Sequence, residues 1–563
     1  MWAQSTRLEH LVSIFIKEDV QERFRTNLLQ YLSTRPPPGY TPILFEEEDN
    51  SRPSQEELDR ALHKFEELSI DWSRELELFK RYTQWITQLN LSSKSMFATR
   101  IIYILQRVHP AVVRDILPRL TSVVFSGDLY PFISTIAITG LSSLRHVTFE
   151  VSRFGPSLKS WIQACRPAVN LTGLTMTLHV DERGHQSLAI SELSSSLQNF
   201  LLDRKWKEIE LPGQVIKSSL LQKLGEVESL ETLVISGPIY SKAKGDTGLD
   251  GVVFKSLRTL RMIGFSGGDY FPRNAVFPNV EHLVLDFVRP TEGKEEWCPV
   301  QYLAAMARAC PKLVNLEVSI PSFQDSELTG LTDLSFEPLF ALSRLARLVV
   351  RTSRVVPISL TDDFLSRAAQ AWPNLQELDI DIVHSTRSLI TLQGLAPLGQ
   401  YCLKLRLLRI GLRLKYVNTV FNPELYGPNA NESDYVCALR YLDVGCPSVY
   451  GSAAVSAFLS TIFPNLRYIE CPEAGNCDLF NEGDHFVWTQ VIKTVCQADR
   501  DRDIDGLAQM LRRQDLRKKL EGVEKGSGSC HEDLVQSSDY DSDDYWAYSG
   551  SECDTYSDSE SDD

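Results

Sequence analysis

The stretch Thr361–Asp381, TDDFLSRAAQAWPNLQELDID, contains a complete structural unit. Its first three residues are polar and can cap the N-terminus of a helix. Apolar residues then recur at helical spacing until Pro373, which has no N–H to donate and ends the helix. Leu378 and Ile380 alternate with polar residues, as in a short strand with one buried face. One helix and one strand cannot bury their own apolar faces, so the unit requires copies of itself on both sides.

Copies of the strand pattern occur along most of the chain. Each copy has an apolar residue followed by further apolar residues three and five positions later. The separation of consecutive copies runs from 23 residues (Leu257 to Val280) to 35 (Leu171 to Trp206). That range overlaps and exceeds the ~20–29 residues of a leucine-rich repeat. The fourteen copies begin at Ile86, Leu120, Leu144, Leu171, Trp206, Leu230, Leu257, Val280, Leu313, Leu345, Leu375, Leu405, Leu439 and Leu466.

In five copies a proline lies two residues before the first apolar residue, which is further evidence for the repeat. These prolines are Pro118, Pro278, Pro311, Pro373 and Pro464. An ordinary α/β domain with leucine-rich strands is the alternative, but it does not explain why the proline returns in phase. The sequence therefore predicts an α/β leucine-rich-repeat solenoid. Its parallel strands would line the concave face of a horseshoe, and its helices would lie on the convex face.

The pattern divides the chain into four regions. Residues 1–85 are expected to form an N-terminal helical region that caps the array, with an amphipathic stripe of Leu8, Leu11, Val12 and Phe15. Residues 86–475 hold the repeats, interrupted by loops near residues 241–251, 290–299 and 415–435. Residues 476–521 are expected to form a C-terminal helical cap, with helices over 486–498 and 504–520. Residues 522–563 form an acidic Ser/Asp/Glu tail whose composition predicts disorder.

The distribution of charge and of cysteines limits the expected partners and cellular compartment. Of the net charge of −16, twelve acidic residues and no Lys or Arg lie between Glu532 and Asp563, which leaves −4 on the rest of the chain. A nearly neutral body predicts no nucleic-acid partner. No apolar run approaches the ~20 residues of a membrane-spanning helix, and no signal peptide is recognisable. Scattered cysteines without a CxxC pair suit a reducing compartment, so we expect a cytoplasmic or nuclear protein without membrane association.

The sequence contains no recognisable catalytic constellation. It has no P-loop, no GxSxG, no HExxH and no nucleotide-binding glycine cluster after a strand. Cys471 and Cys477 near His485 come closest to a metal cluster, but their spacing fits no ligand pattern. We therefore expect a non-enzyme that holds neither a metal nor a cofactor.

Charged residues at the outward strand positions form a candidate partner-binding face. In consecutive strands these positions include Arg351, Asp379, Asp381, Arg409 and Asp443. Neighbouring parallel strands lie ~4.8 Å apart, so Arg351 can pair with Asp381, and Arg409 with both Asp379 and Asp443. One interpretation is a ladder of surface salt bridges, each worth ~0–1 kcal/mol. The other is a mixed-charge floor for a protein ligand.

The acidic tail carries candidate phosphorylation sites. Ser551, Thr555, Ser557 and Ser559 each have Asp or Glu three residues later, which is the pattern that an acid-directed casein-type kinase prefers. Each phosphate would add about −1.5 to −2 charges at neutral pH. One hypothesis is that the tail folds back on the basic segment Arg512–Lys519 and that phosphorylation tightens this contact. The alternative is a solvated tail that only aids solubility.

The last repeats resemble a known family. TLQGLAPLGQYCLKLRLLRIGL from Thr391, ALRYLDVG from Ala438 and SAAVSAFLSTIFPNLRYI from Ser452 resemble the leucine-rich-repeat part of fungal F-box-type proteins. DWSRELELFKRYTQWITQLNL at Asp71–Leu91 is similar to the segment that opens their repeats. The resemblance covers about residues 70–475, and the leading Leu-Pro and later Cys-x-x-Trp of an F-box are missing.

This resemblance implies a function as well as a fold. It implies substrate recognition for a ubiquitin ligase built on a Skp adaptor and a cullin, with the adaptor contact within residues 1–70, where a degenerate F-box remnant would lie. The alternative is a scaffold or interaction protein with no ligase link.

Overall fold

A computed structural model describes most of the repeat array and little outside it. The first of two structural units, Met1–Ala498, holds all the described residues, and the second, Asp499–Asp563, lies outside them. The acidic tail, its four candidate phosphorylation sites and the basic segment Arg512–Lys519 therefore lie outside the described residues. The described residues are 6–7, 86–92, 119–126, 143–151, 161–162, 165–166, 168–178, 197–202, 204–216, 218–237, 251–266, 275–288, 299–320, 330–352, 358–380, 388–412, 436–445, 451–470 and 482–496.

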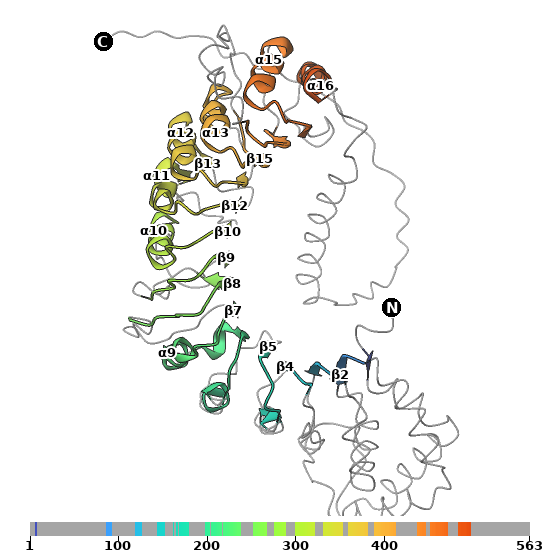
Figure 1. The fold of residues 1–563 in the computed structure, drawn as a ribbon, viewed down its shortest axis with the longest axis vertical. Helices are drawn as coiled ribbons and strands as arrows, with labels where there is room; N and C mark the ends of the chain where they lie inside the picture. The colour runs from blue at the N-terminus through green and yellow to red at the C-terminus, as the bar shows by residue number, and fades with distance from the viewer. Residues whose placement is uncertain are drawn as a thin grey trace, which may run out of the picture. The chain divides into compact units, whose positions relative to one another are not determined.

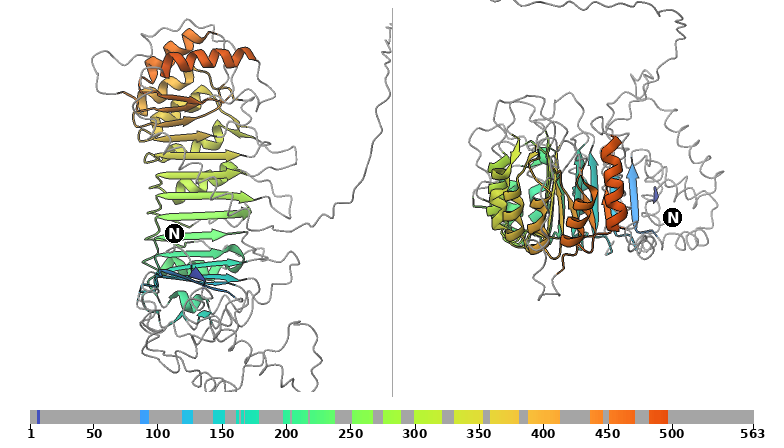
Figure 2. Two further views of the ribbon diagram at one scale, coloured as in Figure 1. Left: turned by 90° about the vertical axis from the view of Figure 1, so that its right-hand side faces the viewer. Right: turned by 90° about the horizontal axis from the view of Figure 1, so that it is seen from above.

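A single sheet of fifteen parallel strands runs through Met1–Ala498. Its strands lie side by side in the order in which they occur along the chain (Figures 1 and 2). Among the described strands, β11 (Leu331–Thr332) and β13 (Ile358–Ser359) form a parallel pair apart from this sheet. The strands of the large sheet are β1 (Thr6–Arg7), β2 (Gln88–Ser92), β3 (Ser122–Ser126), β4 (His146–Val151), β5 (Gly173–Leu178), β6 (Glu208–Pro212), β7 (Thr232–Ser236), β8 (Thr259–Ser266), β9 (His282–Val288), β10 (Asn315–Ile320), β12 (Arg347–Thr352), β14 (Glu377–Ile380), β15 (Leu407–Arg409), β16 (Tyr441–Asp443) and β17 (Tyr468–Glu470).

The predicted register is confirmed in all fourteen copies, because strands β2 to β10, β12 and β14 to β17 each begin two residues after the predicted first apolar residue. The first apolar residue is at most 7 % exposed in every copy, and so is the residue three positions later. The structure is therefore the leucine-rich-repeat solenoid that the sequence predicts, with one continuous apolar core.

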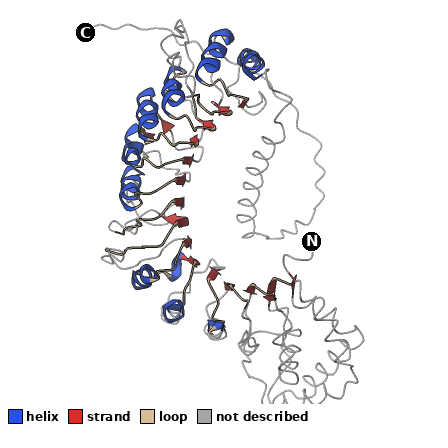
Figure 3. Cartoon of the chain, viewed as in Figure 1, coloured by secondary structure: helices blue, strands red, loops and turns tan. Residues whose placement is uncertain are grey.

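The helices lie on the other side of this core from the strands (Figure 3). A strand can bury only one face against them, so its alternate residues point to the concave face. The described part of the chain includes the helices α9 (Ser218–Glu226), α10 (Pro299–Ala309), α11 (Asp333–Phe336), α12 (Asp362–Ala371), α13 (Ala396–Tyr401), α15 (Ser452–Ile462) and α16 (Glu482–Cys496), with 3₁₀ turns η3 (Gly213–Val215), η4 (Glu337–Ala341) and η6 (Gln393–Leu395).

The local signals in the repeat at α12 act as expected. The hydroxyl of Thr361 accepts a hydrogen bond from the backbone N–H of Phe364 at 3.4 Å, which caps the helix. The helix ends at Ala371, two residues before Pro373. Trp372 is fully buried, and its indole N–H donates to the carbonyl of Leu339 at 3.0 Å in the preceding repeat.

Threonine–aspartate contacts tie the helix starts of neighbouring repeats together. Asp333 accepts hydrogen bonds from the backbone N–H and the hydroxyl of Thr361. One repeat later, Asp362 accepts from the N–H and the hydroxyl of Thr391, both at 2.7 Å. A Cβ on Gly394 would lie 2.0 Å from the carboxylate of Asp362, so any larger residue there would displace this carboxylate. We call these two contacts the Thr–Asp interlock.

The shortest repeat, between β8 and β9, is backed by extended chain in its described part. Val253 and Val276 form an isolated parallel bridge, and the rings of Phe254 and Phe277 stack 5.2 Å apart behind the strands. Extended backbone at these residues closes the core behind the strands.

The structure corrects three sequence-based boundaries. Thr6–Arg7 pairs with β2 as an edge strand, which the sequence did not predict. Pro299 begins α10 instead of ending a loop, since proline is favoured at a helix start. The helix expected at 486–498 covers Glu482–Cys496.

Several predictions concern parts that the structure does not describe. They are the helices of residues 8–85 and 504–520, most of the three loops, and the cysteines Cys471 and Cys477. In the part of the chain that is described, no helix is both long enough and apolar enough to cross a membrane.

Candidate protein-binding face

The outward positions of strands β10 to β17 place charged side chains on the concave face. These positions are the third, fifth and seventh residues of each copy, counted from its first apolar residue. The strands lie side by side in parallel register, so residues from repeats about 30 positions apart become direct neighbours. The described charged residues are Glu317, Arg347, Arg351, Glu377, Asp379, Arg409, Asp443 and Glu470.

Arg409 is the centre of one network, which we call the Arg409 network. Its Nε lies 2.9 Å from Asp443 Oδ2, and its Nη1 lies 3.4 Å from Asp379 Oδ2. This lateral pairing of Asp379, Arg409 and Asp443 confirms the geometric prediction. Nη2 also donates to the hydroxyl oxygen of Tyr441 at 3.4 Å and lies 3.7 Å from Glu470 Oε2, two contacts that the sequence did not predict.

The Arg409 network is largely shielded from water. Asp379 is 3 % exposed and Asp443 6 % exposed, and the side chain of Arg409 is 18 % exposed. Buried charges are costly unless they are paired, so each carboxylate depends on the guanidinium. Burial alone would lower the pKa of Arg409, but the charges of Asp379 and Asp443 outweigh burial and raise its pKa. Arg409 is therefore fixed in its charged form.

A second network surrounds Arg347 on β12. Its Nη1 lies 3.0 Å from Glu317 Oε2 on β10, and its Nε lies 2.9 Å from Glu377 Oε2 on β14. Burial would lower the pKa of Arg347, but the charges and hydrogen bonds of Glu377 and Glu317 outweigh it and raise the pKa. The fifth and seventh positions of consecutive strands do not reveal this network, because Arg347 and Glu377 occupy the third.

The remaining predicted pair is only half described. Arg351 lies on β12, directly opposite Ser319 of β10. Asp381 lies outside the described residues, so the expected contact between Arg351 and Asp381 stays a prediction.

An aromatic pair adjoins the Arg409 network at β16 and β17. The rings of Tyr441 and Tyr468 stack with centroids 5.4 Å apart and an interplanar angle of 13°. Tyr441 is buried, but Tyr468 is 37 % exposed, and the side chain of the neighbouring Glu470 is 43 % exposed. Tyrosine and arginine are over-represented among the residues that dominate protein interfaces. Tyr468 and Glu470 are thus the accessible part of this face.

A polar row crosses strands β4 to β7 of the same face. His146 Nε2 lies 3.1 Å from the hydroxyl of Thr175, whose own proton can go to Glu210 at 3.4 Å, and Ser236 donates to Glu210 at 3.3 Å. The imidazole lies over Gly173, where a Cβ would be 2.1 Å from Nδ1. Burial lowers the pKa of His146, and Glu208 opposes that effect. The row therefore offers hydrogen-bonding groups more than charge.

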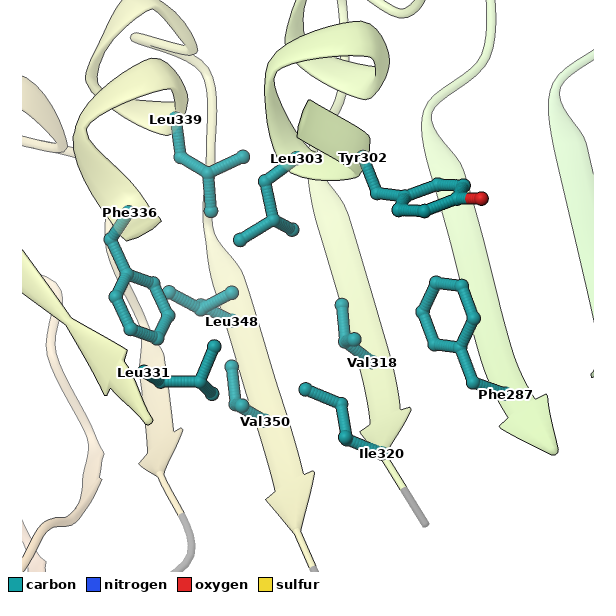
Figure 4. A pocket seen from close by; sticks show the side chains of 10 residues that line it. All are labelled: Phe287, Tyr302, Leu303, Val318, Ile320, Leu331, Phe336, Leu339, Leu348 and Val350. Carbon is teal, nitrogen blue, oxygen red and sulfur yellow. The ribbon is translucent and has the colours of Figure 1, made fainter. Parts of the chain in front are cut away.

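An apolar pocket lies under the helices between β9 and β12 (Figure 4). Its volume of about 10 Å³ is near the minimum for one water molecule, and its walls lack the polar partners that a water needs. The pocket is therefore a packing defect and offers no room for a ligand. It is lined by Phe287, Tyr302, Leu303, Val318, Ile320, Leu331, Phe336, Leu339, Leu348 and Val350.

Four of the five described cysteines have a structural role. Cys165, Cys310, Cys402 and Cys437 are buried and unpaired with one another, and burial raises the pKa of Cys402 to about 12. The thiol of Cys402 donates weakly to the carbonyls of Ala369 and Trp372 in the preceding repeat. Within the described residues, no three His, Cys, Asp or Glu side chains come together as a metal site.

No protein-family model matches this sequence, and no curated protein matches it. Among solved structures, the chain is similar to one described as "Crystal structure of TLR13-ssRNA13 complex", with 12 % sequence identity and a TM-score of 0.29. The match covers 69 % of this chain and 54 % of that one, so the similarity spans about half of the TLR13 chain. A likeness at this level carries no argument about partners.

Proposed function

We propose that this chain is a protein-recognition protein that binds its partner on the concave face of the repeat array. The observation that carries the proposal is the accessible corner formed by Tyr468 and Glu470 beside the pre-arranged Arg409 network. Networks that are already paired lose little side-chain freedom on binding, which favours affinity.

The charge of the face favours a basic partner. At the described outward positions of β10 to β17 there are five carboxylates and three guanidiniums. The carboxylates are Glu317, Glu377, Asp379, Asp443 and Glu470, and the guanidiniums belong to Arg347, Arg351 and Arg409. Lys or Arg side chains of a partner would complement this excess, and Tyr468 offers a ring face for a cation.

The finer proposal is that the chain is the substrate-recognition subunit of a Skp–cullin ubiquitin ligase. Its support is the resemblance of residues 70–475 to the repeats of fungal F-box-type proteins. The adaptor contact is assigned to residues 1–70, where Leu8, Leu11, Val12 and Phe15 form an apolar stripe.

A scaffold without adaptor binding is the second candidate. It is favoured by the absence of the leading Leu-Pro and the Cys-x-x-Trp of an F-box from the sequence.

The concave face is tested by affinity purification and mass spectrometry of partners with matched variants. We expect Tyr468→Ala combined with Glu470→Lys to lose partners that the unmodified chain retains. Tyr401→Ala is the control, because Tyr401 is 49 % exposed at the end of helix α13, away from the strands. Equal partner profiles for all three chains would contradict binding on this face.

The ligase link is tested by co-purification of the full chain with a Skp adaptor. We expect Leu11→Asp combined with Phe15→Asp to abolish adaptor binding, and Tyr468→Ala combined with Glu470→Lys to leave it intact. No adaptor binding by the unmodified chain would favour the scaffold instead, without affecting the test of the concave face.

A further inference from the structure

Besides the concave face, the structure defines a second surface, the rim along which the strands begin. In each copy, the residues immediately before and after the first apolar residue lie on this edge. The strands run side by side and enter along one edge of the sheet (Figure 2), so these residues form two rows along the array. We call this surface the entry rim.

Backbone hydrogen bonds fix the spacing of the entry rim. The N–H of Arg406 donates to the carbonyl of Gln376 at 2.8 Å, that of Arg440 to Arg406 at 3.1 Å, and that of Arg467 to Arg440 at 3.1 Å. Residues in one row are therefore on directly adjacent strands, ~4.8 Å apart. Arg406, Arg440 and Arg467 occupy the same position in three consecutive repeats.

The entry rim is strongly basic. Among its described positions from Arg119 to Arg467 there are eleven basic residues, all exposed, and two acidic residues, Glu231 and Glu281. In the six copies from β10 onward, neither of the two rim positions holds an acidic residue. The basic residues are Arg119, Arg145, Lys205, Lys207, Arg258, Lys312, Arg344, Lys404, Arg406, Arg440 and Arg467.

Neutral groups hold several of these side chains in place. The ammonium of Lys312 donates to the side-chain carbonyl of Asn279 at 2.7 Å, and that of Lys404 to Asn374 at 2.8 Å. Such contacts orient a lysine without neutralising its charge. In the other row, Arg406 and Arg440 lie on adjacent strands and are both exposed.

We propose that the entry rim from Lys312 to Arg467 docks an acidic, Asp/Glu-rich polypeptide segment of a partner protein. A row of cations on strands ~4.8 Å apart complements the negative charge of an acidic segment. This surface is separate from the concave face, so a partner on one leaves the other accessible.

The composition of the rim favours a polypeptide over nucleic acid. Single-stranded nucleic acids bind where aromatic side chains stack on their bases, and none of the described rim positions holds an aromatic residue.

The test measures binding of a fluorescein-labelled poly(glutamate) peptide to the full chain by fluorescence anisotropy at low and physiological salt. The rim variant is Arg406→Glu with Arg440→Glu, and its charge-matched control is Lys223→Glu with Lys493→Glu, on helices α9 and α16. We expect the rim variant to bind at least about tenfold more weakly and the control to bind as the unmodified chain does.

Three outcomes would overturn the proposal. They are no peptide binding by the unmodified chain at low salt, equal loss of binding in the rim variant and the control, and tighter, rim-dependent binding of an oligo(dT) of matched charge. The last outcome would assign the rim to nucleic acid. Thermal melting checks that the variants fold, and Arg406→Gln with Arg440→Gln replaces the rim variant if charge reversal prevents folding.

Discussion

Leu378 shows what one apolar side chain contributes to the array. It is fully buried on β14, in the register that the sequence predicts. We expect Leu378→Ala to lower the free energy of unfolding by ~2–5 kcal/mol, because it removes buried area and leaves a cavity. Urea unfolding measures the change, with Leu389→Ala as control because Leu389 is 43 % exposed. A neutral Leu378→Ala would contradict the proposed core.

Arg409 contributes to the stability of the fold as well as to the charge network on the concave face. Arg409→Met would leave Asp379 and Asp443 buried without their shared cation, so we expect a loss of ~3–5 kcal/mol. Arg367→Met is the control, because the contact of Arg367 with Glu337 is exposed and should matter little. If chemical denaturation showed the same small effect for both variants, the carboxylates of the Arg409 network would have other sufficient partners.

At the residue scale, the sequence predicted contacts that depend only on the repeat period. Asp379, Arg409 and Asp443 share one position in three consecutive repeats, so sequence spacing alone brings them together. Arg347 reaches Glu317 diagonally, from a third position to a fifth, which depends on side-chain length and rotamer. Such contacts cannot be predicted from the repeat period and are found only in the structure.

The Thr–Asp interlock stabilises the helix layer at the scale of elements. Asp362→Ala removes two hydrogen bonds from Thr391 and leaves its backbone N–H without that acceptor, so we expect a loss of ~1–3 kcal/mol. Asp363→Ala is the matched control, since its side chain is 75 % exposed on the same helix turn. Equal unfolding midpoints for the two variants would show that the interlock contributes nothing.

Buried thiols at the helix ends predict a pH dependence of stability. The pKa of Cys402 rises from 9.0 to about 12 in the folded chain because burial disfavours the thiolate. Below pH 9 the thiol is protonated in both states, and its contribution to stability is fully present. As the pH rises from 9 to about 12, only the unfolded state releases this proton, so stability falls. We expect Cys402→Ala to lose less stability than the unmodified chain over this interval, as measured by urea unfolding; parallel curves would contradict this.

At the element scale, helix starts and ends followed from threonine caps and prolines, whereas short strands did not. The pairing of β11 with β13 involves two residues in each strand and has no periodic signal in the sequence. Likewise, the bridge between Val253, which precedes β8, and Val276, which precedes β9, has no periodic signal in the sequence.

At the scale of the whole molecule, β1 closes one edge of the large sheet. Thr6 and Arg7 pair with Leu89 and Asn90 of β2. Deleting residues 1–50 should leave the repeats folded but open the edge of β2, and exposed edges pair with other chains. We expect concentration-dependent self-association in sedimentation velocity, and none when only residues 1–5 are deleted. If the variant that lacks residues 1–50 stayed monomeric, the edge of β2 would not need β1 to prevent self-association.

Topology at this scale was predictable, but charge distribution was not. A repeat period forces sequential parallel strands, and the structure has that order. The near-neutral net charge of the body, by contrast, gives no sign of charged surfaces, yet basic residues gather on the entry rim and carboxylates on the concave face. The net charge is a sum over all positions of the repeat. The register of the strands shows which of these charges lie on the same surface.

The sequential strand order has a consequence for how the protein is made. Each strand pairs with a neighbour that leaves the ribosome only 23 to 35 residues later from β2 onward. A nascent chain can therefore add one repeat at a time onto those already folded, without waiting for its C-terminus. During synthesis the last completed strand is always an open edge, so a pause in translation would expose it for longer. The growing chain is most vulnerable to aggregation at that single advancing strand.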